Sequence, residues 1–267
     1  MPDLVDTLVN ERPSALQTSF LAHKLVAHRN VHDADARHLD TILRRNQRTV
    51  EPGTPLMELG SPHSEIHIIL EGWALRRKIM PGGASQIVAL HLPGDICEFN
   101  AVLGTASDTE TIAVDRVRAG TISARALNEL ATHPRLSRAL WLEAMASGSI
   151  QRQWFANIAC ANAASRMAHL LCELELRLDL MGASQTQRGG GRLFACPLTQ
   201  MHLGNAAAMS VEHANRTLAQ LRRQFGLVAR NGQIEIGDLP ALQAFCGFDG
   251  SYIALETNNR ALAMAHN

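Results

Sequence analysis

Residues 210–226 (SVEHANRTLAQLRRQFG) concentrate hydrogen-bonding side chains on one side of a predicted helix. Ser210 is a helix-start signal, and apolar residues follow it at three- and four-residue spacing on a narrow stripe: Ala214, Leu218, Leu221 and Phe225. The opposite side carries Glu212, Asn215, Arg216, Gln220 and Arg223. A carboxylate accepts hydrogen bonds, a guanidinium donates them and an amide does both. This face is therefore suited to recognising a polar partner rather than to packing in a core.

The residues on both sides of this helix predict a helix-turn-helix followed by a wing. Thr199 can cap a short preceding helix with Leu203 and Ala207 on its apolar face, and three residues then lead to Ser210, the cap of the second helix. Beyond the second helix, GLVARNGQIEIGDL alternates on both sides of Asn231–Gly232, the dipeptide that type I′ hairpins need.

This order of elements predicts binding to double-stranded DNA. The major groove has room for one α-helix, and Arg, Asn and Glu side chains can bond to its base edges. The arginines near the helix outnumber Glu212 and Glu235; they are Arg188, Arg192, Arg222, Arg223 and Arg230. Because phosphates supply most of the affinity of such modules, we assign Arg222 and Arg223 to phosphate contacts.

The rest of the chain predicts the elements that position this unit. Two helical segments, SALQTSFLAHKLVAH and DADARHLDTILRR, come first. From about residue 48, glycines separate short β-branched runs roughly every ten positions, which indicates a compact antiparallel barrel or roll. The predicted fold class is α+β. It has an N-terminal antiparallel, jelly-roll-like β-roll with flanking helices, a long helix, and a C-terminal winged helix-turn-helix.

Residues 134–161 predict one long helix that pairs with a second copy of the chain. Its stripe follows a spacing near three and four over about six turns, as in coiled coils, and consists of Leu136, Leu140, Ser147, Ile150, Trp154 and Ile158. A helix packed on its own barrel is the alternative reading of the same stripe.

Composition narrows the class of protein. The 267 residues contain 25 basic and 25 acidic side chains, so the net charge indicates no partner. No run approaches the roughly 18 apolar residues that span a bilayer, and the N-terminus lacks signal-peptide character, so we expect a cytoplasmic protein. An odd number of cysteines with no close pair favours reduced thiols over disulfides or a zinc site; they are Cys97, Cys160, Cys172, Cys196 and Cys246. We expect no cofactor and no metal.

Residues 198–237 resemble the winged helix-turn-helix of the Crp/Fnr family of bacterial transcription regulators. The resemblance rests on LTQ at 198–200, HANRTL at 213–218, the NGQIEI hairpin and, upstream, IILEGWALRRKIMPGGASQIVALHLPGD at 68–95. It implies a sensor β-roll similar to a cyclic-nucleotide-binding domain at 25–133, a dimerisation helix at 134–161 and a DNA-binding domain at 162–248. An N-terminal extension (1–24) and a C-terminal tail (249–267) flank them.

The resemblance also implies a function and site residues. It implies a homodimeric regulator, not an enzyme, that binds a pseudo-palindromic operator and works with RNA polymerase. Glu212 and Arg216 match the family's base-reading positions; a carboxylate can accept from cytosine N4, and an arginine can bond guanine O6 and N7. Val211 and Asn215 are further candidates for base contact, Val211 through a thymine methyl group. Thr199, Gln200 and Ser210 match phosphate-facing positions at helix starts.

The sensor region departs from relatives that bind cyclic AMP. Those carry Gly-Glu-x-Ala-Leu and then an Arg that holds the cyclic phosphate, whereas residues 95–114 here read DICEFNAVLGTASDTETIAV. Asp108, Thr109 and Glu110 occupy the stretch of that Arg, and acidic groups there would repel a phosphate. We therefore expect an effector other than cyclic AMP. Because the first cysteine is Cys97, an N-terminal cysteine cluster for a [4Fe–4S] centre is excluded as well.

Two alternatives from other classes stay open. HIILEG at 67–72 resembles the metal motif of cupin enzymes, and His63, His67 and His91 fall in the predicted roll. In an extended strand, residues 63 and 67 lie four rises of about 3.3 Å apart, too far to share a metal bound at about 2.0–2.1 Å. The other alternative is a cyclic-nucleotide-binding module whose C-terminal helices contact protein. The excess of arginines around the predicted recognition helix and the missing Gly-Glu-x-Ala-Leu and Arg residues both disfavour it.

Overall fold

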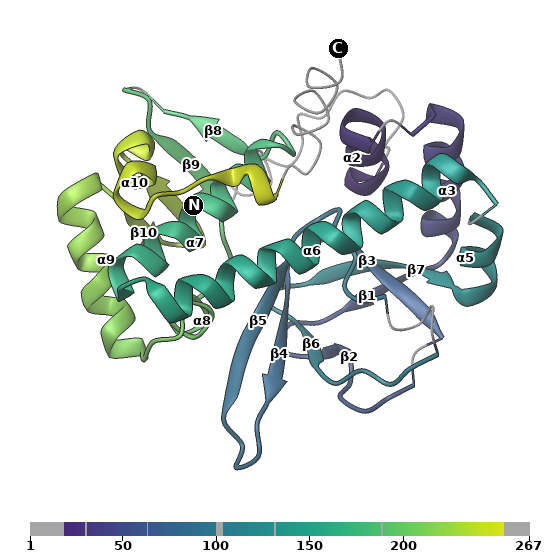
Figure 1. Ribbon diagram of the computed structural model, residues 1–267, viewed down its shortest axis with the longest axis horizontal. Helices are drawn as coiled ribbons and strands as arrows, with labels where there is room; N and C mark the ends of the chain where they lie inside the picture. The colour runs from purple at the N-terminus through teal and green to yellow at the C-terminus, as the bar shows by residue number, and fades with distance from the viewer. Residues whose placement is uncertain are drawn as a thin grey trace, which may run out of the picture.

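The computed structural model describes residues 19–29, 31–62, 64–99, 104–130, 132–187 and 189–253. Most of the predicted N-terminal extension and C-terminal tail lies outside these residues. Figure 1 shows two lobes, a β-roll and a smaller α/β lobe, on opposite ends of one long helix that crosses the molecule diagonally. This α+β arrangement confirms the predicted fold class.

The first lobe is an antiparallel β-roll preceded by α2 (Phe20–Arg29) and α3 (Asp33–Arg45). One sheet has the order β1-β7-β3, with β1 Gln47–Val50, β7 Val117–Ser123 and β3 Glu65–Glu71. The other has the order β2-β6-β4-β5, with β2 Pro55–Met57, β6 Glu110–Ala113, β4 Ala74–Ile79 and β5 Ser85–His91. The N–H of Met80 donates to the carbonyl of Ala84 (2.8 Å), which closes the hairpin turn between β4 and β5.

Two helices leave the roll. The short α5 (Ala124–Leu130) is followed by α6 (Pro134–Cys160), which agrees with the long helix predicted at 134–161. Proline in the first turn is compatible with a helix start because the N–H that it lacks has no intrahelical acceptor there. No glycine or proline other than Gly148 interrupts the 26 residues that follow Pro134.

The predicted dimer stripe of α6 needs correction. Leu136 and Leu140 are buried in the core that α6 shares with α2 and α3, and Trp154 is buried against α7 (Ala163–Asp179). These three side chains cannot meet a partner because their own chain covers them. Ser147 and Ile150 are half-buried, and Ile158 alone of the six is exposed.

The second lobe contains the helix-turn-helix and a small sheet. Its elements are α7, β8 (Ser184–Thr186), β9 (Arg192–Ala195), α8 (Gln200–Ala206), α9 (Val211–Phe225), β10 (Val228–Arg230), β11 (Gln233–Ile236) and α10 (Leu239–Cys246). The sheet order is β10-β11-β9-β8. Asn231 and Gly232 both have positive φ, 51° and 70°, and Arg230 pairs with Gln233, so the predicted type I′ wing is confirmed.

One hydrophobic cluster continues across both lobes. It joins Trp73, Ile87 and Leu90 of the roll to Trp154 and to the core of the second lobe, including Met167 and Leu221. The lobes are therefore packed on each other rather than joined only by a linker. Among the described residues, none of the helices combines the length and apolar character that crossing a bilayer requires.

Candidate nucleic-acid interface

Both helices of the helix-turn-helix begin with the caps that the sequence predicts. Thr199 Oγ1 accepts from the N–H of His202 (3.2 Å), and His202 Nδ1 accepts from the N–H of Thr199 (3.3 Å), which forms a capping box. Ser210 Oγ accepts from the N–H of His213 (3.3 Å) at the start of α9. Gly226 ends α9 in the left-handed region at φ +66°. Local signals thus fix where each helix begins and where α9 ends.

The turn between the helices is tight. Ala208 has φ +52°, a left-handed conformation that is strained for any residue with a Cβ. A Cβ on Gly204 would lie 2.9 Å from the Cβ of Ala214, so a side chain as small as glycine's is required where the helices cross. Arg166 of α7 reinforces this turn, because its Nε donates to the carbonyl of Ala207 (2.9 Å) and its Nη1 to that of Ala161 (2.9 Å). The two helices are therefore held as one rigid unit.

The predicted base-reading residues lie together on an open surface. Val211, Glu212, Asn215 and Arg216 are all exposed in the first turns of α9, whereas Ala214, Leu218 and Leu221 on the opposite side are buried. The backbone N–H of Glu212 and the hydroxyl of Ser210 hold the pKa of the Glu212 carboxyl below its usual range. Glu212 is therefore an anion and an acceptor at neutral pH.

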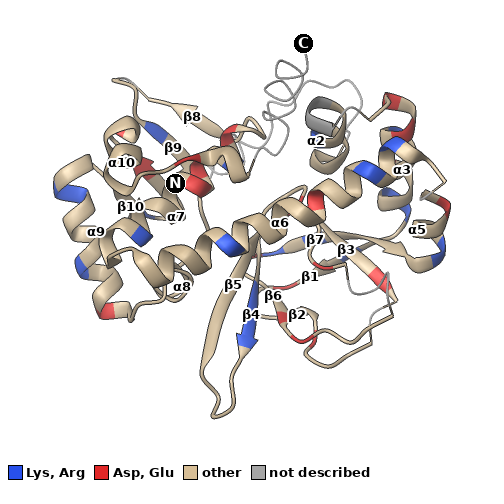
Figure 2. Ribbon diagram, in the orientation of Figure 1, with Lys and Arg blue, Asp and Glu red and all other residues tan. Residues whose placement is uncertain are grey.

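The predicted phosphate contacts surround this face. Thr199 and Gln200 at the start of α8, Ser210 at the start of α9, and Arg222 and Arg223 in its last turn are exposed. Figure 2 shows basic positions along α9 and an acidic position near its start. Among the described residues of this lobe, no acidic side chain forms an ion pair with Arg216, Arg222 or Arg223 within 4 Å. The surface keeps its positive charge available for a polyanion.

Two exposed side chains near this face were not singled out by the sequence argument. His213 lies one turn before Arg216 on α9, and Met201 is 56% exposed in the first turn of α8. The three-residue spacing between His213 and Arg216 was the available signal for the first. For Met201 the sequence carried no signal, because an apolar residue in a short helix is usually taken for core.

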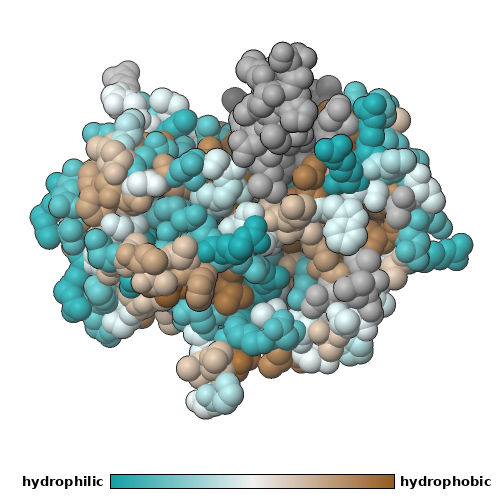
Figure 3. All heavy atoms as spheres, in the orientation of Figure 1, coloured by the Kyte–Doolittle hydropathy of each residue, from teal (hydrophilic) through white to brown (hydrophobic). Residues whose placement is uncertain are grey.

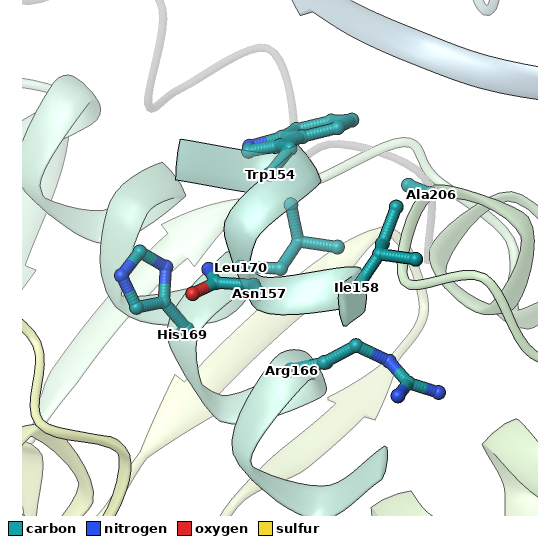
Figure 4. Close-up of a pocket in the computed structure, with 7 residues that line it drawn as sticks. All are labelled: Trp154, Asn157, Ile158, Arg166, His169, Leu170 and Ala206. Atoms are coloured by element: carbon teal, nitrogen blue, oxygen red, sulfur yellow. The ribbon is translucent and has the colours of Figure 1, made fainter. Parts of the chain in front are cut away.

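A small pocket lies where α6, α7 and α8 meet, behind the helix-turn-helix. It is lined by Trp154, Asn157, Ile158, Arg166, His169, Leu170 and Ala206. Figure 4 shows Asn157 and His169 side by side at one end and Arg166 at the other. His169 is buried, its Nδ1 has no hydrogen-bond partner among the described residues, and burial lowers its pKa to about 4, so the ring is neutral at pH 7.

Residues 95–114 of the roll, which lack the Gly-Glu-x-Ala-Leu motif and the Arg that follows it, carry other polar contacts. Ser107 Oγ donates to the carboxylate of Glu98 (2.7 Å), and both side chains are buried together with Thr109. The acids of the cassette stretch are paired with β4: Asp108 with Lys78 (2.5 Å) and Glu110 with Arg77 (2.7 Å).

These ion pairs weaken the repulsion of a phosphate that the sequence predicts, because neighbouring cations balance the acids at 108 and 110. The cation that would hold a cyclic phosphate is still missing from residues 107–110.

The histidines of the roll do not form a metal site among the described residues. His67 and His91 are buried in β3 and β5, which belong to different sheets, and His63 lies outside the described residues. In the part of the chain that the structure describes, no group of three or more His, Cys, Asp or Glu side chains is arranged to hold a metal ion.

Comparison with known proteins agrees with this geometry. Residues 47–133 match the cyclic nucleotide-binding domain family, and residues 165–245 match the Crp-like helix-turn-helix domain family. The chain is 25% identical over 227 residues to an anaerobic regulatory protein of Haemophilus influenzae, covering 84% of this chain and 85% of the relative. It is also 25% identical over 220 residues to the fumarate and nitrate reduction regulatory protein of Salmonella typhimurium, covering 82% and 84%.

Solved structures show the same fold. FixK2 from Bradyrhizobium japonicum superposes with a TM-score of 0.64 at 20% identity, covering 74% of this chain and 96% of that one. TTHB099, a transcriptional regulator from Thermus thermophilus, superposes with a TM-score of 0.60 at 21% identity, covering 75% and 97%. The matched families, the curated relatives and the open, basic recognition helix agree. The chain is a DNA-binding transcription regulator, not an enzyme, and belongs to the Crp/Fnr family.

Proposed function

We propose that α9 enters the major groove of double-stranded DNA and reads bases through Val211, Glu212, Asn215 and Arg216. The observation that carries this proposal is that the four side chains are exposed together at the start of one helix whose opposite side is buried. Arg216 bonds to a guanine through O6 and N7, and Glu212 accepts from a cytosine N4. Val211 is apolar and 39% exposed, which suits contact with a thymine methyl group.

The phosphate backbone is held around this helix. Thr199, Gln200 and Ser210 lie at the first residues of α8 and α9, where backbone N–H groups and the helix dipoles favour an anion. Arg222 and Arg223 add charge at the other end of α9. The wing at Asn231–Gly232 is exposed and carries Arg230, which extends the basic surface beyond the helix.

The protein binds DNA as a homodimer that pairs through α6. We define the α6 seam as Trp141, Met145, Gly148, Arg152, Phe155 and Ala159, which follow each other at spacings of four and three residues in strict alternation. This is the spacing of a coiled-coil seam. Trp141 is 64% exposed and Phe155 74% exposed, an unusual state for large side chains on a helix.

The surface of α6 agrees with a covered seam in the assembled protein. Figure 3 shows apolar patches near the middle of the visible face, where this helix runs, with hydrophilic residues between them. Gly148 at the centre of the seam permits close approach of two helices. Pairing places two recognition helices on one side of the dimer, so the operator is pseudo-palindromic with half-sites one helical turn apart. The bound dimer acts with RNA polymerase at the promoter.

The sensor roll responds to a molecule other than cyclic AMP. The support is the lack of a phosphate-binding Arg in the stretch where Ser107, Thr109 and Glu110 lie, together with the pairing of Ser107 and Glu98 with each other.

Selection of bound sequences from random DNA tests the function directly. The full-length protein is expected to enrich an inverted repeat that contains a guanine or cytosine in each half-site. Enrichment of no motif, at salt concentrations from low to physiological, would contradict sequence-specific binding.

A further inference from the structure

The two lobes are joined by hydrogen bonds to the outer edge of strand β5. This strand is the last in the sheet order β2-β6-β4-β5, so one side of its backbone has no strand to pair with. Asn205 of α8 takes the place of a neighbouring strand there. Its Oδ1 accepts from the N–H of Ile87 (2.6 Å), and its Nδ2 donates to the carbonyl of Ser85 (2.9 Å).

A third hydrogen bond comes from the roll to the same residue. Gln86 Nε2 donates to the backbone carbonyl of Asn205 (2.5 Å), near the end of α8. Asn205 is thus bonded through its side-chain oxygen, its side-chain nitrogen and its backbone carbonyl. A single amide side chain that satisfies both a donor and an acceptor of an edge strand fixes orientation as well as distance.

Arg177 of α7 holds β5 at a second point. Its Nη2 donates to the carbonyl of Leu90 (2.9 Å), and the same guanidinium pairs with Asp95 in the turn that follows β5. Ile87 and Leu90 are three residues apart, roughly 10 Å along a strand. The register of β5 against β4 shifts between them, so backbone groups at both points face outward. One anchor would leave the second lobe free to pivot, whereas two anchors fix its angle.

The orientation set at Asn205 passes directly to the recognition helix. Asn205 is followed by Ala206, Ala207 and the strained Ala208, and Arg166 bonds to the carbonyl of Ala207. Gly204, the residue before Asn205, meets Ala214 of α9 at the helix crossing. Any rotation of α8 about β5 therefore rotates α9 by the same angle.

We propose that Asn205 is a positioning residue for operator recognition: by bonding to the edge of β5 it sets the angle of the recognition helix relative to the sensor roll and the dimer helix. This inference rests on the proposed function. In a dimer that reads two half-sites, a fixed angle makes binding sensitive to the spacing between them. Loss of the anchor leaves each recognition helix intact but lets it adapt to a wrong spacing.

The experiment compares three DNA duplexes with full-length protein. They carry the selected operator, the same operator with one base pair inserted between half-sites, and a single half-site. The measured quantity is the spacing penalty, the ratio of the dissociation constants for the second and first duplexes. Two lost hydrogen bonds correspond to roughly a tenfold change in an equilibrium. Asn205→Ala is therefore expected to lower the spacing penalty roughly tenfold and to leave half-site affinity unchanged.

Control variants separate positioning from stability. Asn46→Ala removes an Asn amide that bonds to the carbonyl of Ile42 (3.0 Å) far from the lobe contact, and it should keep the full penalty. Gln86→Ala removes the third bond from the roll side and should lower the penalty in the same direction. If Asn205→Ala does not fold, as judged by circular dichroism and thermal unfolding, the spacing penalty of Gln86→Ala tests the inference instead; a folded Asn205→Ala that loses half-site binding contradicts it.

The outcomes distinguish the inference from the function on which it rests. Wild-type protein that binds no selected duplex overturns the proposed function. Wild-type protein that binds while Asn205→Ala, or Gln86→Ala in its place, keeps the full spacing penalty overturns the positioning role alone.

Discussion

The indole N–H of Trp154 donates a 2.8 Å hydrogen bond to the carboxylate of Glu173, and both residues are buried where α6 meets α7. Tyr252 donates to the same carboxylate oxygen (2.9 Å), and Arg177 lies beside its other oxygen. Burial raises the pKa of Glu173, and these partners oppose that rise. Trp154 therefore ties α6 to the DNA-binding lobe of its own chain.

Trp154→Phe is expected to destabilise the protomer without dissociating the dimer. The change keeps an aromatic ring but removes a donor from a buried carboxylate, which costs about 1–3 kcal/mol of unfolding free energy. Urea unfolding measures the loss, and sedimentation velocity reports the oligomeric state. A variant that sediments as a monomer at full folded stability would place Trp154 in the interface after all.

Phe155→Glu is expected to separate the dimer into folded monomers. Phe155 is 74% exposed on the α6 seam, so pairing would bury the new charge in an apolar interface. Met80→Glu serves as the control, because Met80 is an exposed apolar residue (51%) at the β4–β5 turn, away from the seam. Light scattering should show a halved mass for the first variant only. An unchanged mass for Phe155→Glu would exclude the seam as the interface.

Arg216→Ala and Arg223→Ala are expected to weaken DNA binding in different ways. Loss of a bidentate base contact at Arg216 should cost about 1–3 kcal/mol on the operator and relax the preference at one base pair. Loss of a phosphate contact at Arg223 should weaken binding to all sequences alike and reduce the salt slope by about one. Titrations against operator and scrambled duplexes at several salt concentrations separate the two roles. Exchanged behaviour would mean that the helix enters the groove with a different face.

Unfolding free energy is expected to fall as the pH drops below about 6.5. Burial lowers the pKa of His91 to about 3 and that of His169 to about 4, whereas both groups titrate near 6.5 in the unfolded chain. Between these values the unfolded state binds more protons, so each histidine removes about 1.4 kcal/mol of stability per pH unit. Denaturant unfolding of wild type and His169→Phe between pH 6.5 and 4.5 measures the slopes.

For the His169→Phe variant, unfolding free energy should fall less steeply with decreasing pH than for wild type, by about 1.4 kcal/mol per pH unit, because one buried histidine has been removed. Leu136→Ala removes buried apolar volume from the separate core that α6 shares with α2 and α3, so it should lower stability equally at every pH and keep the wild-type slope. Identical slopes for wild type and His169→Phe would show that His169 already titrates normally in the folded protein.

Ala208→Gly is expected to stabilise the protein by up to about 1 kcal/mol. Ala208 has φ +52°, which glycine adopts without strain, although the gain is partly offset because glycine increases the entropy of the unfolded chain. Ala207→Gly is the matched control, since Ala207 has φ −88° and gains nothing from glycine. Thermal unfolding should move upward for the first variant and downward for the second. A lower midpoint for Ala208→Gly would mean that the Ala208 methyl group contributes packing that outweighs the strain.

Local chemistry made much of the DNA-binding lobe predictable. The hydroxyl groups of Thr199 and Ser210 act at their helix starts, and Asn231 adopts the positive φ that a type I′ turn requires. Each of these signals acts within a few residues of its own position. The exposed face of α9 followed because the periodicity of its apolar residues left only one side for solvent.

The faces of α6 could not be assigned from the sequence. This 27-residue helix packs on both lobes and carries exposed apolar residues as well, and Leu136, Trp154 and Phe155 all fit a three- and four-residue spacing. Which side faces inward depends on contacts with residues remote in the chain, such as Glu173. Asn205 gave no signal for the same reason, since its partners on β5 lie 118 and 120 residues earlier.

The contact between α8 and β5 also covers an edge strand on which other chains could otherwise add. An uncovered outer strand is a template on which another polypeptide can add itself, the first step of many fibrils. Here the DNA-binding lobe covers β5. Because the β-roll is synthesised before the DNA-binding lobe, chains truncated before residue 200 leave β5 uncovered. Such chains are expected to aggregate, while the complete chain does not.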